Sequence, residues 1–167
     1  MVVEGLAHGQ SFKSARAWAQ TSAIRSERMA DVEMEERGRT VLRWPLALIY
    51  LGFGCLHLTQ PQPFLPIMPG WMPFPREVIL FTGACEVAGG AGLLIPRTRR
   101  LAGIMLAIYA VCVFPANLHH ALDHVHVAAL PDSWWYHGPR LAFQPVFVWW
   151  ALYAGAIDWP SRRRAAA

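Results

Sequence analysis

The sequence predicts an all-α membrane protein, a bundle of four transmembrane helices with both termini in the cytoplasm. Three observations predict it: four long apolar segments, an uneven distribution of Lys and Arg, and tryptophans near the segment ends. With 54% hydrophobic and 16% charged residues in 167 positions, the chain is apolar for a soluble domain. The lipid bilayer is therefore its first predicted partner.

The four apolar segments are residues 41–59, 78–95, 101–122 and 141–157. Each is about 17 to 22 residues long, close to the roughly 20 that a helix needs to cross about 30 Å of hydrocarbon. A soluble four-helix bundle would show a polar stripe every three or four residues, and the stretches 46–53 and 101–114 show none. Four membrane-spanning helices are the better explanation.

The positive charges predict the orientation. Thirteen of the 15 Lys and Arg residues lie before or at the start of the first segment, in the connection 96–100, or after the fourth segment. Only Arg76 and Arg140 lie in the other two connections. The positive-inside rule then places both termini and the 96–100 connection in the cytoplasm. Because the membrane orientation explains the net charge of +4, we predict no nucleic-acid partner.

The region before the first segment is different in composition. Residues 1–40 hold six basic and six acidic side chains and lack the apolar core of a secretory signal. Three interpretations stay open: an amphipathic surface helix within 14–28, a disordered extension, or a true start at Met29 or Met34. We predict the transmembrane domain at 41–159 and a basic tail at 160–167.

Prolines shape two parts of the predicted bundle. The first outer connection, residues 60–76, carries six prolines interleaved with apolar side chains. Such a segment can neither form a regular helix nor dissolve freely in water, so we expect it to lie over the outer mouth as a lid. Pro115 should kink the third helix about one turn before its outer end.

Glu86 is the most informative residue, because it lies in the middle of the apolar segment 78–95. A charge at the centre of a bilayer costs roughly 2.5 to 3.5 kcal/mol on insertion scales. Gly83, Gly89 and Gly90 share its helical face, and small residues mark the face on which another helix approaches. The carboxyl should therefore face protein, either as a functional group or as a hydrogen bond that locks the bundle.

Counting along the helices gathers further polar residues near Glu86. At 1.5 Å per residue, His57, Gln144, Asn117 and Glu86 lie about 3, 5, 8 and 12 Å inside the outer ends, with Arg140 at the rim. This predicts an outward-facing polar pocket. In it Glu86 would exchange a proton and His57 would relay it, as the catalytic pair, while Asn117, Arg140 and Gln144 would bind an anionic or carbonyl group of the substrate.

A metal site is an alternative at the outer end of the third segment. His120, Asp123 and His124 would share one face of a continued helix, in a pattern that suits Zn, Cu or Ni but is common without metal. The three cysteines lie one per helix without a C-x-x-C pair, typical of small apolar residues, although a redox pair of Cys55 and Cys85 stays open.

Several motifs in order along the chain resemble one family. They are GCLHLTQP at 54–61, IMPGWMPFP at 67–75, CEVAGGAGLLIPRTRR at 85–100, FPAN at 114–117 and RLAFQP at 140–145. Together they resemble the DoxX-like family of small four-helix membrane proteins. The stretch HHALDHVH at 119–126 is richer in histidine than in those relatives.

The resemblance implies a four-helix bundle and an association with redox work, since some relatives are membrane subunits of thiosulfate or quinone oxidoreductases. It also implies that His57, Glu86, Asn117, Arg140 and Gln144 are the family's polar positions. We therefore expect a multi-pass protein of the bacterial cytoplasmic (inner) membrane, the membrane subunit of a quinone- or thiosulfate-linked redox system. A quinone is the candidate cofactor, and a redox protein or a second copy of the chain are the candidate partners. A non-catalytic scaffold or assembly factor is the alternative.

Overall fold

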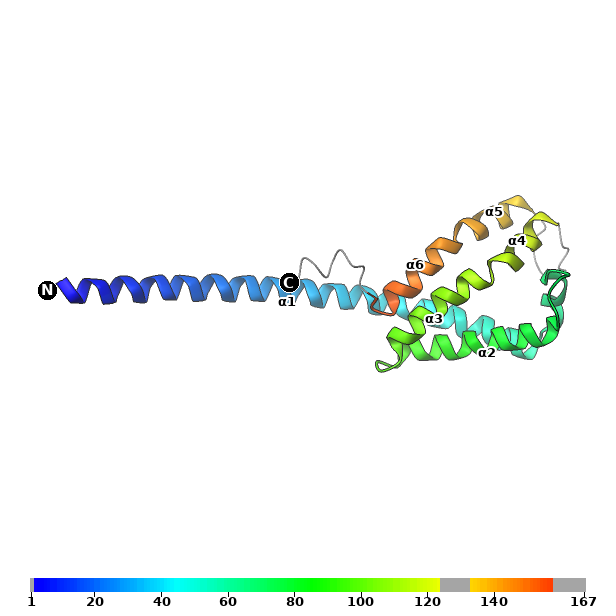
Figure 1. Ribbon diagram of the computed structural model, residues 1–167, viewed down its shortest axis with the longest axis horizontal. Helices are drawn as coiled ribbons and strands as arrows, with labels where there is room; N and C mark the ends of the chain where they lie inside the picture. The colour runs from blue at the N-terminus through cyan, green and yellow to red at the C-terminus, as the bar shows by residue number, and fades with distance from the viewer. Residues whose placement is uncertain (1, 124–132, 158–167) are drawn as a thin grey trace. The chain divides into compact units, whose positions relative to one another are not determined.

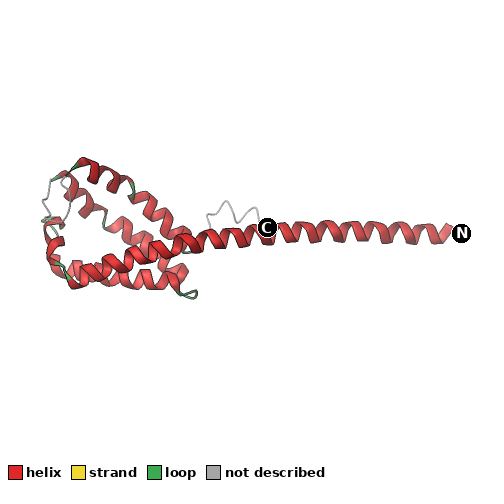
Figure 2. Ribbon diagram, turned by 180° about the vertical axis from the view of Figure 1, so that it is seen from behind, coloured by secondary structure: helices red, strands yellow, loops and turns green. Residues whose placement is uncertain are grey.

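A computed structural model describes residues 2–123 and 133–157, with side chains from residue 16 onward (Figure 1). All regular structure in these residues is helical (Figure 2). The elements are α1 Val2–Thr59, the 3₁₀ helix η1 Gln62–Ile67, α2 Pro75–Leu94, α3 Arg99–Cys112, α4 Phe114–Leu122, α5 Trp134–Ala142 and α6 Gln144–Ala154. The prediction of an all-α chain is confirmed for these residues.

The chain divides into two compact units, residues 1–38 and 39–167. The first unit is the amino-terminal part of α1, where most of the described side chains are exposed. The three interpretations of residues 1–40, a surface helix, a disordered extension or a later start, all stay predictions. The second unit contains the rest of α1 and all other elements, and the predicted tail at 160–167 lies outside the described residues.

Small residues bring the helices of the second unit together. A Cβ atom on Gly90 of α2 would lie 2.9 Å from the Ala47 carbonyl oxygen of α1, and one on Gly103 of α3 would lie 2.7 Å from the Ala151 carbonyl oxygen of α6. The indole nitrogen of Trp150 in α6 donates a hydrogen bond to the Leu42 carbonyl of α1. Since α2 also packs on α3, the contacts close into a ring.

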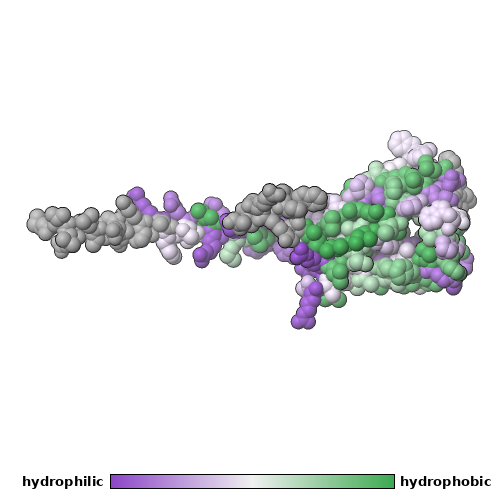
Figure 3. Space-filling view, in the orientation of Figure 1, coloured by the Kyte–Doolittle hydropathy of each residue, from purple (hydrophilic) through white to green (hydrophobic). Residues whose placement is uncertain are grey.

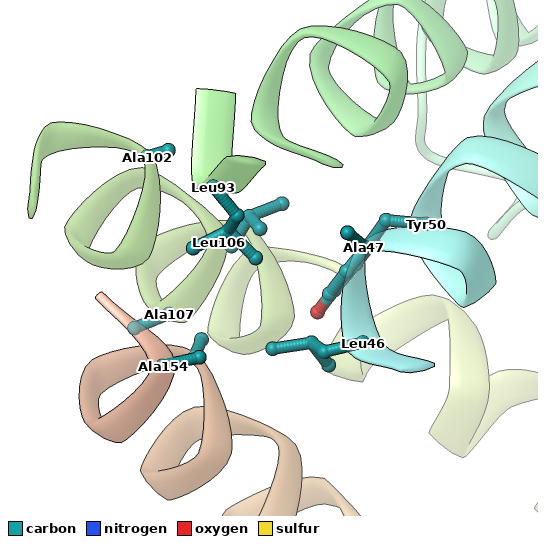
Figure 4. Packing of buried hydrophobic residues seen from close by; sticks show 9 residues of the cluster. Leu46, Ala47, Tyr50, Leu93, Ala102, Leu106, Ala107 and Ala154 are labelled. Atoms are coloured by element: carbon teal, nitrogen blue, oxygen red, sulfur yellow. The ribbon is translucent and has the colours of Figure 1, made fainter. Parts of the chain in front are cut away.

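The buried core is built largely from small apolar residues. It comprises Leu46, Ala47, Tyr50, Leu93, Ala102, Leu106, Ala107, Ala151 and Ala154 (Figure 4). Large apolar side chains lie on the outside instead; Phe81 of α2, for example, is 70% exposed, and apolar residues cover much of the visible face of this unit (Figure 3). Water-soluble proteins rarely expose such continuous apolar surface, whereas lipid-facing helices do so routinely.

Within residues 2–123 and 133–157, three helices are long and apolar enough to cross a membrane: Trp18–Thr59, Pro75–Leu94 and Arg99–Leu122. The last of these joins α3 and α4, and only Val113 separates the two, next to Pro115 at the start of α4. The helix is thus interrupted next to Pro115, where the sequence predicted a kink. The match to three of the four predicted segments supports a membrane protein, while the four-span count and the placement of the termini stay predictions.

The fourth predicted segment, 141–157, requires a correction. The structure divides it at Phe143 into the end of α5 and the whole of α6, because Pro145 in the first turn of α6 has no backbone N–H to continue the helix. Helix α5 also begins earlier than predicted, at Trp134, where the Ser133 side chain accepts a hydrogen bond from the Trp135 backbone N–H.

A buried arginine closes the end of the unit opposite the proline-rich segment. Arg43 of α1 is only 3% exposed, and its Nε donates a 3.0 Å hydrogen bond to the carbonyl of Ala154, the last residue of α6. Helix carboxyl ends carry unpaired carbonyls and partial negative charge, so a cation is stabilising there. The sequence predicted only that Arg43 marks the cytoplasmic side.

Two glycines of one helix make a matched test of this packing. A Cβ on Gly54 would lie 2.8 Å from the Gly83 carbonyl oxygen, whereas a Cβ on Gly52 would meet nothing within 4 Å. We expect Gly54→Ala to lower the free energy of unfolding by about 1 to 3 kcal/mol through overpacking. Gly52→Ala should be neutral or stabilising by up to about 1 kcal/mol. Thermal unfolding in detergent measures both, and equal effects would contradict the close approach of α1 and α2.

Candidate functional site

Glu86 of α2 and His57 of α1 form a buried pair. Glu86 is 5% exposed, and its Oε2 lies 2.5 Å from Nδ1 of His57. The contact is possible because Gly54 and Gly83 lie beside it: a Cβ on Gly83 would lie 2.8 Å from the His57 Cβ. The prediction that Glu86 faces protein is confirmed, and its nearest polar partner is the predicted relay residue.

The geometry of this pair suits proton exchange. A carboxyl and an imidazole joined by one short hydrogen bond can pass a proton from one group to the other. Both side chains are largely buried, at 16% exposure for His57 and 7% for Glu86. Water therefore competes little for this proton, and the pair can bind or release it as a general acid and base.

Two tyrosines complete this group, and the sequence analysis missed both. Tyr109 of α3 hydrogen-bonds through its hydroxyl to the Glu86 carboxyl and also interacts with Thr82, while Tyr50 of α1 interacts electrostatically with Glu86. The two tyrosine rings meet edge to face at 6.0 Å. A signal for Tyr50 was present, because it precedes His57 by seven residues and thus lies on the same face two turns away.

The proline-rich segment covers His57. The ring of Phe64, in η1, packs against the His57 ring with centroids 4.2 Å apart. On the other side of the segment, the carbonyl oxygen of Ile67 lies 3.0 Å from Nδ1 of His119 in α4. Because η1 contacts both α2 and α4, this short helix holds the segment against the bundle, as the lid prediction requires.

The predicted substrate-binding residues form a second hydrogen-bonded group. Arg140 of α5 donates through Nη2 to the Asn117 side-chain oxygen of α4 at 2.7 Å. Asn117 in turn donates to the Gln144 side-chain oxygen of α6 at 3.1 Å, and Gln144 donates to the Ala110 carbonyl of α3. The structure thus brings all three predicted residues together. They come from α4, α5 and α6.

Aromatic residues and a neutral histidine surround the Arg140 guanidinium. Its Nη1 donates to Nδ1 of His120 at 2.7 Å, and because arginine only donates, His120 must accept with an unprotonated Nδ1. The guanidinium also lies over the Tyr136 ring, 5.9 Å from its centroid, and the buried His137 ring lies 4.7 Å from His120. An arginine keeps its positive charge in proteins, so the guanidinium is a permanent cation at this position.

Helix α3 connects the two groups. Tyr109 contacts Glu86, and the carbonyl of the next residue, Ala110, accepts the hydrogen bond from Gln144. The predicted pocket therefore consists of two adjacent polar groups rather than one ring of side chains. One group is built around the His57–Glu86 hydrogen bond and the other around a fixed positive charge.

A surface pocket of about 390 Å³ lies elsewhere, between the proline-rich segment and α4. Its polar residues, His119 and Asp123, approach each other to 3.3 Å. The pocket therefore borders the lid and not the Glu86 pair. It is lined by Pro69, Gly70, Trp71, Pro115, Leu118, His119, Leu122 and Asp123.

The described part of the chain does not bring the predicted metal ligands together. His124 lies outside the described residues, His120 is occupied by Arg140, and Asp123 faces His119. Among the described residues, no three His, Cys, Asp or Glu side chains gather as metal ligands would. Cys55, Cys85 and Cys112 are free, with Cys55 and Cys112 exposed.

A double-mutant cycle tests the His57–Glu86 pair. We expect His57→Ala and Glu86→Gln each to destabilise the protein, and the double variant to lose less than the sum, with a coupling of about 1 to 3 kcal/mol. The exposed pair Glu33–Arg37, whose side chains are 66% and 77% exposed, is the control and should couple by less than about 0.5 kcal/mol. Chemical or thermal unfolding in detergent measures both cycles. Additive effects at His57 and Glu86 would argue against a direct interaction.

Comparison with known proteins supplies a family. The model of the family described as "Domain of unknown function (DUF8561)" matches residues 46–155, a range that holds both polar groups and covers more than half of the chain. No curated protein and no solved structure matches the chain significantly. By this match, the chain belongs to the family described as Domain of unknown function (DUF8561).

Proposed function

We propose that this chain is a four-pass protein of the bacterial cytoplasmic membrane and the membrane subunit of a redox system, linked to a quinone or to thiosulfate. The observation that carries the proposal is the buried His57–Glu86 pair, with Tyr109 beside it and Phe64 above it, inside a bundle with an apolar exterior. The resemblance to DoxX-like proteins supports the redox assignment.

The fourth pass in this proposal is α5 together with α6. From Trp134 to Ala154 these helices cover about 21 residues, close to the span of a bilayer at 1.5 Å per residue. They pack along α4 and α3, which form a candidate span themselves. An even number of passes also places all thirteen clustered basic residues on one side, as the positive-inside rule favours.

The chemistry proposed for the pair is proton exchange coupled to electron transfer. Reduction of a quinone to a quinol takes up two electrons and two protons, and the reverse reaction releases them. Glu86 would pass protons to or from the quinone oxygens, and His57 would exchange them with the outer aqueous phase. The electrons would come from, or go to, a redox partner protein. Asn117, Arg140 and Gln144 would hold a carbonyl or anionic group of the ligand.

The apolar core supports one-sided access in this scheme. Leu46, Leu93 and Leu106 are almost completely buried and form one cluster with Tyr50 (Figure 4). Along α1, Leu46 lies between Arg43 and Tyr50. Such close-packed side chains exclude water, so protons would reach Glu86 from the outer end alone.

A scaffold or assembly factor is the second candidate, favoured by two exposed tryptophans. Trp135 is 91% exposed, at the outer end of the proposed fourth pass, and Trp71 is 70% exposed, in the proline-rich segment. Exposed Trp is enriched at protein interfaces as well as at membrane surfaces. A scaffold would co-purify with one membrane protein at a fixed ratio and would tolerate Glu86→Gln.

Quinone binding is the direct test of the redox proposal. We expect purified protein to bind a soluble ubiquinone or menaquinone analogue saturably, and Glu86→Gln to weaken binding about tenfold or more through the loss of one charge-assisted hydrogen bond. Glu77→Gln, an exposed carboxyl on the same helix, should bind like the parent protein. Titration followed by intrinsic tryptophan fluorescence measures the affinity. Absence of binding in all three proteins would remove the quinone assignment.

Labelling with a membrane-impermeant maleimide tests the topology. In a variant without Cys55, Cys85 and Cys112, we expect an added Trp135→Cys to react in intact spheroplasts. An added Arg97→Cys should react only after the membrane is opened, because the proposed topology places residue 97 in the cytoplasm. Reaction of both positions from the same side would contradict four passes.

A further inference from the structure

We infer that the Arg140 group is an anion-binding site for a tetrahedral oxyanion, either free or as the phosphate of an anionic lipid headgroup. The inference deepens the ligand-holding role given to Arg140 and rests on the proposed function for that role. It needs neither a quinone nor the His57–Glu86 pair, so the two proposals can fail separately.

The positive charge of the Arg140 guanidinium favours an anionic ligand. The groups that contact the Arg140 guanidinium are the neutral His120 ring, the Asn117 amide and the Tyr136 ring. In the described ranges, no acidic side chain contacts Arg140; Glu86 pairs with His57, and Asp123 pairs with His119. Within the described part of the chain, this half-buried positive charge contacts dipoles and rings but no negative charge, which favours the binding of an anion.

Arg140 also has more N–H donors than the described residues use. A guanidinium has five N–H groups, and the described residues accept from two of them, one on each terminal nitrogen. The Nε–H and one further N–H on each terminal nitrogen remain for a ligand. Arg140 is half-buried and not sealed, so a ligand can reach it. Adjacent N–H groups in a planar fork match two oxygens of a sulfate or phosphate.

The Arg140 guanidinium is also held in place before any ligand binds. Asn117 is held by Gln144, and Gln144 is held by the Ala110 carbonyl of α3, so the oxygen that orients Arg140 is itself fixed. His120, 1% exposed, fixes the other terminal nitrogen. A guanidinium held from both sides loses little side-chain entropy when it binds an anion.

The class of ligand follows from these features. A metal cation would be repelled by the guanidinium, and the nearest histidine already uses its Nδ1 as an acceptor. A neutral carbonyl could accept one N–H but would leave the charge uncompensated. An oxyanion satisfies both the charge and the paired donors, which is why we commit to this class.

The test uses full-length protein in a neutral detergent, titrated with sodium sulfate or sodium phosphate against sodium chloride at constant ionic strength. We expect a saturable rise in melting temperature with either oxyanion, since a ligand that binds only the folded state stabilises it. Arg140→Gln should abolish the saturable rise, and Arg140→Lys should weaken binding about tenfold by losing the bidentate fork. Arg76→Gln, an exposed arginine on α2, is the control and should bind like the parent.

Two further arms separate the sources of the oxyanion and protect the test. Native mass spectrometry from nanodiscs of phosphatidylglycerol or phosphatidylcholine shows whether an anionic lipid stays bound through Arg140. If the lipid is retained and Arg140→Lys reduces its retention, the ligand is the headgroup. If only free sulfate or phosphate binds, the ligand is the free ion. If Arg140→Gln does not fold, Arg140→Lys carries the comparison.

Two results would overturn the inference. One is the absence of any Arg140-dependent effect with sulfate, phosphate and phosphatidylglycerol alike. The other is oxyanion binding by Asp132→Asn but not by the parent protein. That result would identify the carboxyl of Asp132, which lies outside the described residues, as the partner of Arg140.

Discussion

The structure depends on the close approach of α1 and α2 at Gly54 and Gly83. A single methyl group at either position would collide with the opposite helix, and only at this separation do the side chains of His57 and Glu86 meet. Without that contact, the carboxyl in the middle of an apolar helix would lose its hydrogen bond to His57, and a buried polar group without its partner is costly. The helix geometry and the site therefore have one cause: the absence of side chains at two positions.

Much of this could be predicted from sequence, because it follows from single helices. The period of the glycines gave the face of Glu86, and Pro115 gave the interruption of the third helix. What could not be predicted depends on contacts between distant segments. Tyr109 reaches Glu86 only because α3 packs on α2, and Arg43 meets α6 across more than a hundred residues of chain. Helix α5 was missed because its start depends on the local Ser133 cap within an aromatic-rich stretch that resembles a loop.

The separation of the polar residues into two groups changes how the site can work. The Glu86 group is a hydrogen-bonded carboxyl and imidazole beside η1, whereas the Arg140 group holds a permanent charge and is fixed by amides. Consecutive residues of α3, Tyr109 and Ala110, contact one group each. The position of α3 therefore fixes the geometry of both groups at once.

The uneven filling of the bundle has a mechanical consequence. Around Leu106, alanines and glycines lock the helices backbone to backbone, and Arg43 ties α1 to the end of α6. At the opposite end, the breaks at Val113 and Phe143 interrupt two helices, and the hydrogen-bonded side chains of Asn117, Arg140 and Gln144 join them instead. Helices bend most readily at proline breaks, so bending of the bundle should concentrate at this end and leave the glycine and alanine contacts in place.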